Sequence, residues 1–250
     1  MTEYSIGVDE AGRGPVIGPL IVCAISIPSN DYNILREIGA IDSKALSKSR
    51  RESIYKLIHQ EAIERSWGIG IIECEPFRID HNNSVSNLNE LEVTLFSEAI
   101  KNSNDNDESG CIFLDACDVN QERFGNKVKS KLGPSWSNWR IISEHSMDSS
   151  NTLVGASSIV AKVTRDNAMQ ELSKEIGIDL GSGYPSDPKT RSSINELIAG
   201  KNPHDCLRWT WSTVRRAWEE MHGTQVPIRH LSKGISSQTN IQHWIEGNHK

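Results

Sequence analysis

Apolar residues gather in short runs along the first part of the chain, and these runs have the length and composition of β-strands. The clearest covers residues 19–27, which are rich in β-branched side chains and end at Pro28. Similar runs occupy residues 4–9, 66–73, 111–114 and 139–143. The hydrophobic pattern therefore predicts five strands.

Between and after these runs, apolar residues recur at the three- and four-residue spacing of helices. Ser47 stands where the N-cap of the first helix is expected. Further helices are predicted over residues 85–101, 151–176, 187–199 and 210–222. Because helical and strand segments alternate, the fold class expected is α/β, with a mixed sheet.

The chain divides into two parts of different composition. Its 250 residues suffice for one domain with an appendage or for two small domains. Tryptophan and arginine become frequent after residue 205, and polar residues predominate beyond Gly223. We therefore predict a main domain over residues 1–205, followed by a C-terminal helical extension and flexible tail over residues 206–250.

Overall composition limits the possible partners. The net charge is -6, so binding to a polyanion would require a local basic patch or bridging metal ions. No apolar run approaches the roughly 18 residues of a membrane span, and the N-terminus is unlike a signal peptide. The five cysteines form no C-x-x-C pair and are typical of free thiols. We expect a cytoplasmic protein without a membrane partner.

Four carboxylates stand where predicted strands end or helices begin. Asp9 and Glu10 close the first strand, Asp115 follows residues 111–114, and Asp148 lies shortly before the long helix. Oxygen ligands without a cysteine or histidine cluster suit hard cations such as Mg²⁺ or Mn²⁺. Each acid could instead be a solvated side chain, and Asp148 could be the helix N-cap.

Directly after the first two acids comes the segment Gly12-Arg13-Gly14. Glycine lets main-chain amides approach a substrate closely, and an arginine side chain suits phosphate. An acidic surface turn without function would have a similar composition. The combination favours a cation site beside a phosphate-binding turn.

Six segments together resemble type 2 ribonuclease H (ribonuclease HII), in the form found in its archaeal and eukaryotic branch. They cover about residues 4–215 in the order that the family has. The segments are Asp9–Pro15 with Gly18-Pro19, Asp42–Ser47, Leu114-Asp115, His145–Asp148, Ala156–Asp166 and Gly181–Pro188.

The resemblance implies a ribonuclease H-like fold, with helices on both faces of a mixed sheet. It implies that Asp9, Glu10, Asp115 and Asp148 hold two divalent ions, Mg²⁺ or Mn²⁺, about 3.5–4 Å apart. The implied enzyme is a monomeric endoribonuclease of replication and repair. It would cleave the RNA strand of RNA–DNA hybrids and nick 5′ to ribonucleotides embedded in duplex DNA, leaving a 3′-hydroxyl and a 5′-phosphate.

Such an enzyme must recognise the ribose 2′-hydroxyl, which DNA lacks. The resemblance gives this role to the turn residues Gly12, Arg13 and Gly14 and to Tyr184. The phenolic hydroxyl and ring of Tyr184 would contact the sugar, although a core tyrosine would give the same sequence. A bulkier residue at Gly14 is expected to impair RNA recognition more than metal binding.

Lys44, Lys162 and Arg165 are candidate phosphate contacts. Lys162 and Arg165 are three residues apart on one helix and share a face, which an ordinary solvated helix would also show. His145 could take part in proton transfer or be structural. Asp118 could reach a metal ion, but a surface loop is the favoured interpretation.

Residues 238–245 resemble the Q-x-x-hydrophobic-x-x-aromatic-aromatic box that docks replication proteins on a sliding clamp. Gln238 opens the box, and Ile241 and Trp244 would insert as anchors. Ile245 stands where an aromatic residue is usual. Alternatively, a terminal helical turn packs Trp244 against the domain.

Two other functions remain open at the level of sequence. One is a catalytically silent nucleic-acid-binding protein of the same fold, but all four acids are present. The other is a metal-dependent small-molecule phosphohydrolase. The cations of residues 162–165, Tyr184 and the tryptophan- and arginine-rich segment 208–218 favour a large polyanionic substrate instead.

Overall fold

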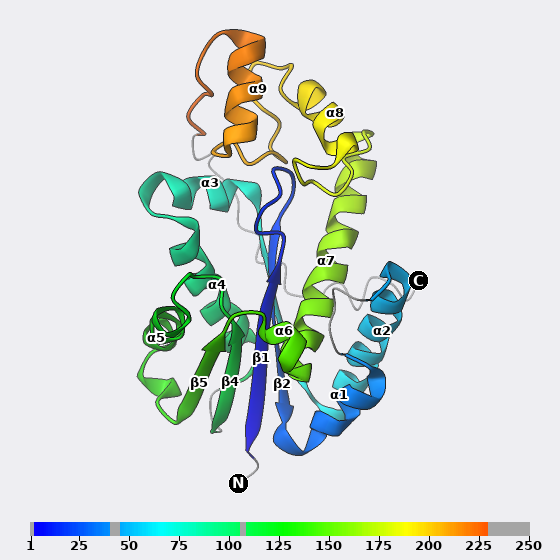
Figure 1. The fold of residues 1–250 in the computed structure, drawn as a ribbon, viewed down its shortest axis with the longest axis vertical. Helices are drawn as coiled ribbons and strands as arrows, with labels where there is room; N and C mark the ends of the chain where they lie inside the picture. Colours follow the sequence, from blue (N-terminus) through cyan, green and yellow to red (C-terminus); the bar gives the residue numbers. More distant parts are fainter. Residues whose placement is uncertain (1–2, 41–45, 106–108, 230–250) are drawn as a thin grey trace.

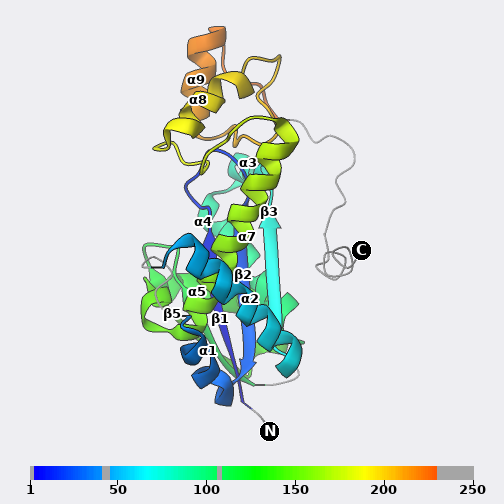
Figure 2. The same cartoon turned by 90° about the vertical axis from the view of Figure 1, so that its right-hand side faces the viewer.

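The computed structural model describes residues 3–40, 46–105 and 109–229, which form a five-stranded mixed sheet with helices on both faces (Figures 1 and 2). The order across the sheet is β3-β2-β1-β4-β5. β2 is antiparallel to β1 and β3, whereas β4 is parallel to β1 and β5. The strands are β1 (Tyr4–Ala11), β2 (Leu20–Pro28), β3 (Gly68–Cys74), β4 (Gly110–Asp115) and β5 (Trp139–Glu144). All five predicted strands are confirmed.

The helices on one face of the sheet are α1 (Tyr32–Ile38), α2 (Lys48–Arg65) and α7 (Thr152–Ile176). On the other face lie α4 (Leu88–Ser103) and α5 (Gln121–Leu132), with α3 (Pro76–Val85) leading into α4. The remaining helices are α6 (Met147–Ser150), α8 (Pro188–Leu197) and α9 (Ser212–His222), and short 3₁₀ turns cover Ser29–Asp31 and Pro134–Trp136. None of the described helices is long and apolar enough to cross a membrane.

Alternation along β2 explains why the protein has a core on each face of its sheet. Leu20 and Val22 pack toward α4 and α5, whereas Ile21 and Cys23 pack toward α2 and α7. Successive strand side chains point to opposite faces, so a run that is apolar throughout is buried on both sides. This explains the unbroken hydrophobic run at residues 19–27.

Helix α7 lies directly over β1 because Gly7 has no side chain. A Cβ atom at Gly7 would be 2.7 Å from the carbonyl carbon of Leu153 in α7. The Ser157 hydroxyl donates a hydrogen bond of 2.8 Å to the Gly7 carbonyl. This close contact brings the first turns of α7 against β1, two residues before Asp9 begins the acidic segment.

A third apolar core joins the C-terminal helices to the β1–β2 connection. Val16 and Ile17 of that connection pack with Leu180, Leu207 and Trp218. Figure 1 shows the connection rising from the sheet to the region of α8 and α9. The domain boundary at residues 205/206 stays a prediction, and this core contains residues from both sides of it.

Four of the described helices, α1, α3, α5 and α6, had no predicted range. α1 and α3 are short, and α4 begins at Leu88, so the predicted helix over 85–101 started too early. The sequence of α5 is mostly polar, and its buried stripe consists of Phe124, Val128 and Leu132. Only three apolar side chains at intervals of four residues indicate this helix, which is a weak periodic signal.

Residues 224–229 pack back against the protein rather than forming a loose tail. Arg229 donates to the Asp80 carboxylate at 3.0 Å and to the Leu207 carbonyl at 3.1 Å, and it also binds Asp205. The prediction of a flexible tail immediately after Gly223 is therefore wrong for this segment. The predicted clamp-binding box at Gln238, Ile241, Trp244 and Ile245 lies outside the described residues.

Candidate active site

Three carboxylates meet at the carboxyl end of the parallel strands. The pairing of β1 with β4 ends at Val8 and Leu114, so Asp9 and Asp115 come next, where the strands part. The backbone N–H of Met147 donates to the Asp115 carboxylate at 3.3 Å, which holds α6 and its Asp148 against this end. Carboxylate oxygens of Asp9, Asp115 and Asp148 lie within 4.8 Å of one another. Sites of α/β folds occur at this edge of the sheet.

The fourth acid, Glu10, points to the opposite face of β1. Its carboxylate forms a second group with Glu92 of α4 and Cys117, again with ligand atoms within 4.8 Å of one another. The Cys117 thiol donates to Glu10 at 3.2 Å. The expected cluster of four acids is thus three acids on the α7 side and Glu10 on the α4 side, because neighbouring strand residues alternate.

Burial and mutual repulsion make the carboxylates hard to ionise. Burial, followed by the charges of Glu10 and Asp115, raises the pKa of Asp9 well above its ordinary value. Burial, followed by the charge of Glu92, raises the pKa of Glu10 to about 7. The thiol of Cys117 has a pKa well above its ordinary value for the same reason, burial beside Glu10. The end of β1 therefore gathers carboxyl groups whose ionised forms are disfavoured by burial and by one another's charge.

These residues fit a divalent cation. Asp9 and Asp148 are 4% and 1% exposed, so water cannot screen their charges fully. A cation among the oxygens would offset the repulsion that raises the carboxyl pKa values. The all-oxygen group of Asp9, Asp115 and Asp148 matches the ligands of hard cations.

The structure decides between the two roles that the sequence left open for Asp148. The N-cap of α7 is Asn151, whose side-chain oxygen accepts from the amides of Leu153 at 2.9 Å and Val154 at 3.3 Å. Asp148 lies in α6, with its carboxylate in the acidic group. The N-cap alternative for Asp148 is therefore wrong.

Lys162 and Arg165 have different surroundings although they share a helix. The Lys162 ammonium donates to Ser158 Oγ at 2.8 Å and lies 4.0 Å from the Asp148 carboxylate, so it borders the acidic group. Ser158 in turn hydrogen-bonds Asp9. Arg165 is buried and donates to the Ser182 carbonyl at 2.9 Å. Tertiary packing covers Arg165, so it does not share a solvent-facing patch with Lys162, and the phosphate contacts of both residues stay a prediction.

The structure brings the Gly12–Gly14 turn and Tyr184 together across 170 residues of sequence. A Cβ atom on Gly14 would lie 3.5 Å from the Tyr184 ring. The amide of Val16 donates to the Gly183 carbonyl at 2.8 Å, which ties the two loops by their backbones. The Arg165 guanidinium lies 5.4 Å from the centre of the Tyr184 ring. Lys44, the remaining candidate phosphate contact, lies outside the described residues.

Comparison with known proteins agrees with this arrangement. The family model described as Ribonuclease HII matches residues 6–214. A ribonuclease HII of Methanococcus maripaludis is 37% identical over 222 residues, which are 88% of this chain and 90% of the relative. The chain belongs to the ribonuclease HII family. Members of this family are enzymes that hydrolyse RNA in RNA–DNA hybrids, so the predicted resemblance is confirmed.

Solved structures of the family share the fold. The ribonuclease H2 of Pyrococcus horikoshii is 34% identical, with a TM-score of 0.77 over 88% of this chain and 100% of that one. A PCNA:RNase HII complex from Archaeoglobus fulgidus contains a chain that is 32% identical, with a TM-score of 0.71 over 84% of this chain and 95% of that one. The ribonuclease H-like mixed sheet is therefore confirmed as the fold class.

Glu92, which lies beside Glu10, is a buried acid that sequence reasoning missed. It is fully buried, and its carboxylate lies 2.8 Å from Nε of Arg13. Arg13 also donates to Asn89 at 2.6 Å, so α4 holds the side chain of the turn arginine. One signal was available: Glu92 is an acid inside the buried stripe of α4, four residues after Leu88 and four before Phe96.

His145 and Asp118 have structural contacts in this ribonuclease HII. The His145 ring nitrogen lies 2.7 Å from the Asp118 carbonyl, which favours the structural alternative for His145. The Asp118 side chain pairs with Arg123 and accepts from the Asn120 amide at 3.0 Å. Asp118 lies in the loop between β4 and α5, as the favoured interpretation had it, although these contacts leave its own side chain only 4% exposed.

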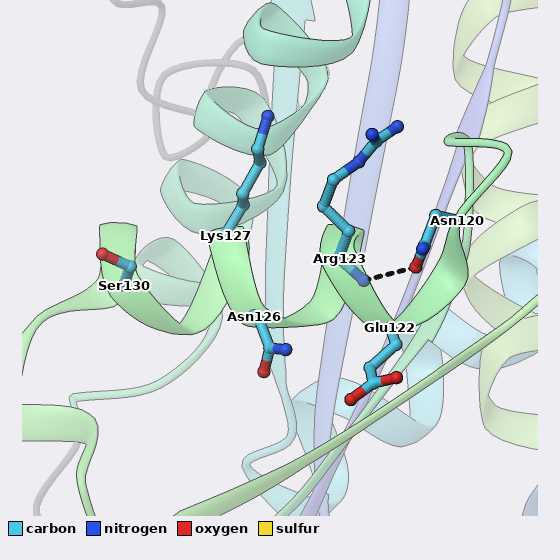
Figure 3. Close-up of a pocket in the computed structure, with 6 residues that line it drawn as sticks. All are labelled: Asn120, Glu122, Arg123, Asn126, Lys127 and Ser130. Atoms are coloured by element: carbon cyan, nitrogen blue, oxygen red, sulfur yellow. Dashed lines mark hydrogen bonds between the residues drawn. The ribbon is translucent and has the colours of Figure 1, made fainter.

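A shallow hollow on α5 lies apart from the acidic groups (Figure 3). Arg123 and Lys127 extend from the same side of α5, and the Asn120 side chain accepts from the Arg123 amide at 2.8 Å. Both cations are paired, Arg123 with Asp118 and Lys127 with Glu90. These ion pairs account for the charges of the hollow without a ligand.

Proposed function

We propose that this protein is a metal-dependent endoribonuclease that cleaves the RNA strand of RNA–DNA hybrids. It also nicks duplex DNA 5′ to an embedded ribonucleotide, leaving a 3′-hydroxyl and a 5′-phosphate. The observation that carries the proposal is the position of the Gly12–Gly14 turn, between the acids at the end of β1 and Tyr184. A sugar read by the turn would place its phosphate beside the carboxylates.

The acids would hold two divalent ions, for which we propose Mg²⁺ or Mn²⁺. Asp9, Asp115 and Asp148, which gather on the α7 side of β1, would supply most of the ligands, and we propose that Glu10 completes the set from its separate group on the α4 side. When bound, such ions lower the pKa of a water molecule and neutralise charge on the leaving oxygen. Lys162, 4.0 Å from Asp148, is placed to contact a phosphate oxygen at the same site.

Recognition of the 2′-hydroxyl would fall to the turn backbone and to Tyr184. Gly12 adopts φ +94° and Gly14 has open backbone beside the tyrosine ring, so peptide groups can reach the ribose. The Tyr184 side chain is 39% exposed, which leaves part of its ring available to a sugar. Deoxyribose lacks the hydroxyl that these polar groups would bind.

Two alternatives receive less support. A catalytically silent binding protein would not need the buried acids. The raised pKa values of Asp9 and Glu10 mean that keeping these groups ionised and close together costs free energy. A small-molecule phosphohydrolase would not need a turn and a tyrosine aligned beside the acids. The tryptophan- and arginine-rich segment supports a polyanionic substrate less than expected. Arg215 and Arg216 are exposed and could contact such a substrate, whereas Arg208 is buried.

A cleavage assay tests the proposal directly. The substrate is a labelled duplex with one embedded ribonucleotide, and the matched control is the all-DNA duplex of the same sequence. With Mg²⁺ or Mn²⁺ we expect a single nick 5′ to the ribonucleotide, and with a chelator we expect none. Equal cutting of the all-DNA duplex, or cutting that survives chelation, would reject the function.

We further propose that residues 238–245 bind a sliding clamp. Support comes from the box at Gln238, Ile241, Trp244 and Ile245 and from a related protein whose solved structure is a complex with PCNA. Deleting residues 236–250 is expected to abolish clamp binding, measured by surface plasmon resonance, and to leave cleavage of short duplexes within about twofold. Clamp binding that persists after the deletion would refute the box.

The remaining proposals concern the protein as a whole. We propose a monomer that acts in the cytoplasm during DNA replication and repair, with a catalytic domain over residues 1–205 and an extension over residues 206–250. All five cysteines are free thiols, which is compatible with a reducing compartment. Sedimentation of the purified protein would test the monomer.

A further inference from the structure

The C-terminal extension contacts the substrate-reading turn through one buried side chain. Arg208 is fully buried, and all three of its guanidinium nitrogens donate to main-chain carbonyls. Nη2 donates to Gly12 at 2.6 Å, Nη1 to Arg13 at 3.0 Å and Nε to Gly18 at 3.1 Å. The backbone amide of Arg208 also donates to the Val16 carbonyl at 2.9 Å. One residue thus joins the turn to Gly18, at the other end of the β1–β2 connection.

We propose that Arg208 is a positioning residue for ribonucleotide selection, which it supports by orienting the peptide groups of the turn. The inference rests on the proposed function, in which this turn reads the 2′-hydroxyl. It gives the C-terminal extension a part in substrate choice that is separate from any contact with the duplex.

The physical link is the planarity of the peptide bond. A carbonyl and the N–H that follows it lie in one rigid plane. Fixing the Gly12 carbonyl therefore fixes the direction of the Arg13 N–H, and fixing the Arg13 carbonyl fixes that of the Gly14 N–H. These two amides belong to the residues to which sugar recognition is assigned. Arg208 binds the carbonyl side of these two peptide planes, and the N–H groups point to the other side.

The position of Arg208 is itself rigid. Its guanidinium lies 5.1 Å from the centre of the Trp211 ring, which packs against its face. The next two residues are attached to α3, because the Asp80 carboxylate accepts from the amides of Trp209 at 2.8 Å and Thr210 at 2.9 Å. Asp80 is buried and is a residue that sequence reasoning missed. Arg208 is therefore held between the turn and a fixed loop.

Burial of a guanidinium is costly unless its donors are used, and here each nitrogen has a carbonyl acceptor. A lysine in this place would keep a positive charge but could not present the planar fork that binds three carbonyls. Arg208→Lys therefore separates charge from geometry. It is the conservative change that this role should not tolerate.

The test compares Arg208→Lys with Arg229→Lys, a matched control in the same extension. Arg229 binds Asp80, Asp205 and the Leu207 carbonyl, none of which belongs to the turn. For each protein we would measure kcat and KM on the single-ribonucleotide duplex and Ki for the all-DNA duplex as a competitor. We expect Arg208→Lys to raise KM at least tenfold with Ki within twofold of wild type. Arg229→Lys should leave the ratio of Ki to KM within twofold.

The melting temperature of every variant is measured to show that it folds. Trp211→Leu is a second probe, because it removes the ring that packs on the Arg208 guanidinium and leaves Arg208 and its carbonyl partners unchanged. It should lower the ratio of Ki to KM in the same direction. A wild-type ratio in folded Arg208→Lys, or an equal loss in both arginine variants, overturns the positioning role. If Arg208→Lys does not fold, an unchanged ratio in Trp211→Leu overturns it. Failure of wild type to prefer the ribonucleotide would instead reject the proposed function.

Discussion

Asp115→Asn is expected to reduce cleavage of a ribonucleotide-containing duplex by at least about a thousandfold. Loss of a residue that only supports a metal ligand typically lowers metal affinity or activity about 10–100-fold. A larger loss is expected for Asp115, because it lies in the acidic group itself. An amide keeps the size of the side chain but removes its charge and one of its anionic oxygens. The remaining carboxylates, Asp9 and Asp148, would hold a cation much more weakly.

The same substitution is expected to stabilise the metal-free protein. Asp115 contributes to the repulsion that raises the pKa values of Asp9 and Glu10. The pKa of Glu10 in the folded protein is about 7 against an ordinary value of 4.5, so the folded state binds protons more tightly than the unfolded chain. The stability of the metal-free protein therefore falls as pH rises between these values. Removing the Asp115 charge reduces that loss.

Scanning calorimetry in a chelator at pH 5 and pH 8 measures this effect. We expect the melting temperature of Asp115→Asn to exceed that of wild type at pH 8, by about 2–4 °C for each kcal/mol gained, and the gap to shrink at pH 5. Asp118→Asn is the matched control, because it loses an ion pair with Arg123 outside the acidic groups and should melt lower. An active Asp115→Asn, or one less stable than wild type at pH 8, would contradict the assignment.

Gly12→Ala is expected to have the second largest effect, larger than Gly14→Ala. Gly12 has φ +94°, and an added Cβ would lie 2.4 Å from Nε of Arg165 and 2.8 Å from the Pro19 carbonyl. The backbone conformation alone costs an alanine about 1–3 kcal/mol, and the backbone carbonyl of Pro19 cannot move aside easily. We expect a lower melting temperature and a loss of kcat/KM of at least about tenfold, or 1.4 kcal/mol.

At Gly14 an added Cβ would meet the Tyr184 ring at 3.5 Å, an ordinary contact. Gly14→Ala should therefore fold normally, and Gly14→Leu should displace Tyr184 and raise KM for the ribonucleotide duplex. Metal titrations of both variants should match wild type. The sequence singled out Gly14 for its effect on recognition, whereas the strain of the turn lies at Gly12.

Gly133→Ala provides the control for Gly12→Ala, because Gly133 has φ +89° with nothing within 4 Å of an added Cβ. Gly133→Ala should lower the melting temperature through the backbone conformation alone, because its Cβ meets no other atom, and it should leave cleavage unchanged. Calorimetry and steady-state kinetics on the three alanine variants separate these terms. The assignment fails if Gly12→Ala is no more harmful than Gly133→Ala.

Local patterns in the sequence were sufficient for the strands and for the placement of the acids. The apolar run 19–27 predicted β2, and Asp9 and Asp115 were predicted at strand ends, where the structure has them. These features depend on residues close together in the chain, so periodicity and strand ends reveal them.

The partners of those residues were decided only by tertiary packing. Arg165 was a candidate phosphate contact, and Arg208 belonged to a segment that favoured a polyanionic substrate. Both side chains are buried and donate to carbonyls of the β1–β2 connection. Glu92 reaches Glu10 and Arg13 only because α4 packs on that face of the sheet. Whether a charged side chain is solvated or buried depends on contacts with residues far away in sequence. The sequence by itself determined the strands and the acids at their ends, whereas the folded chain decided which charges meet there.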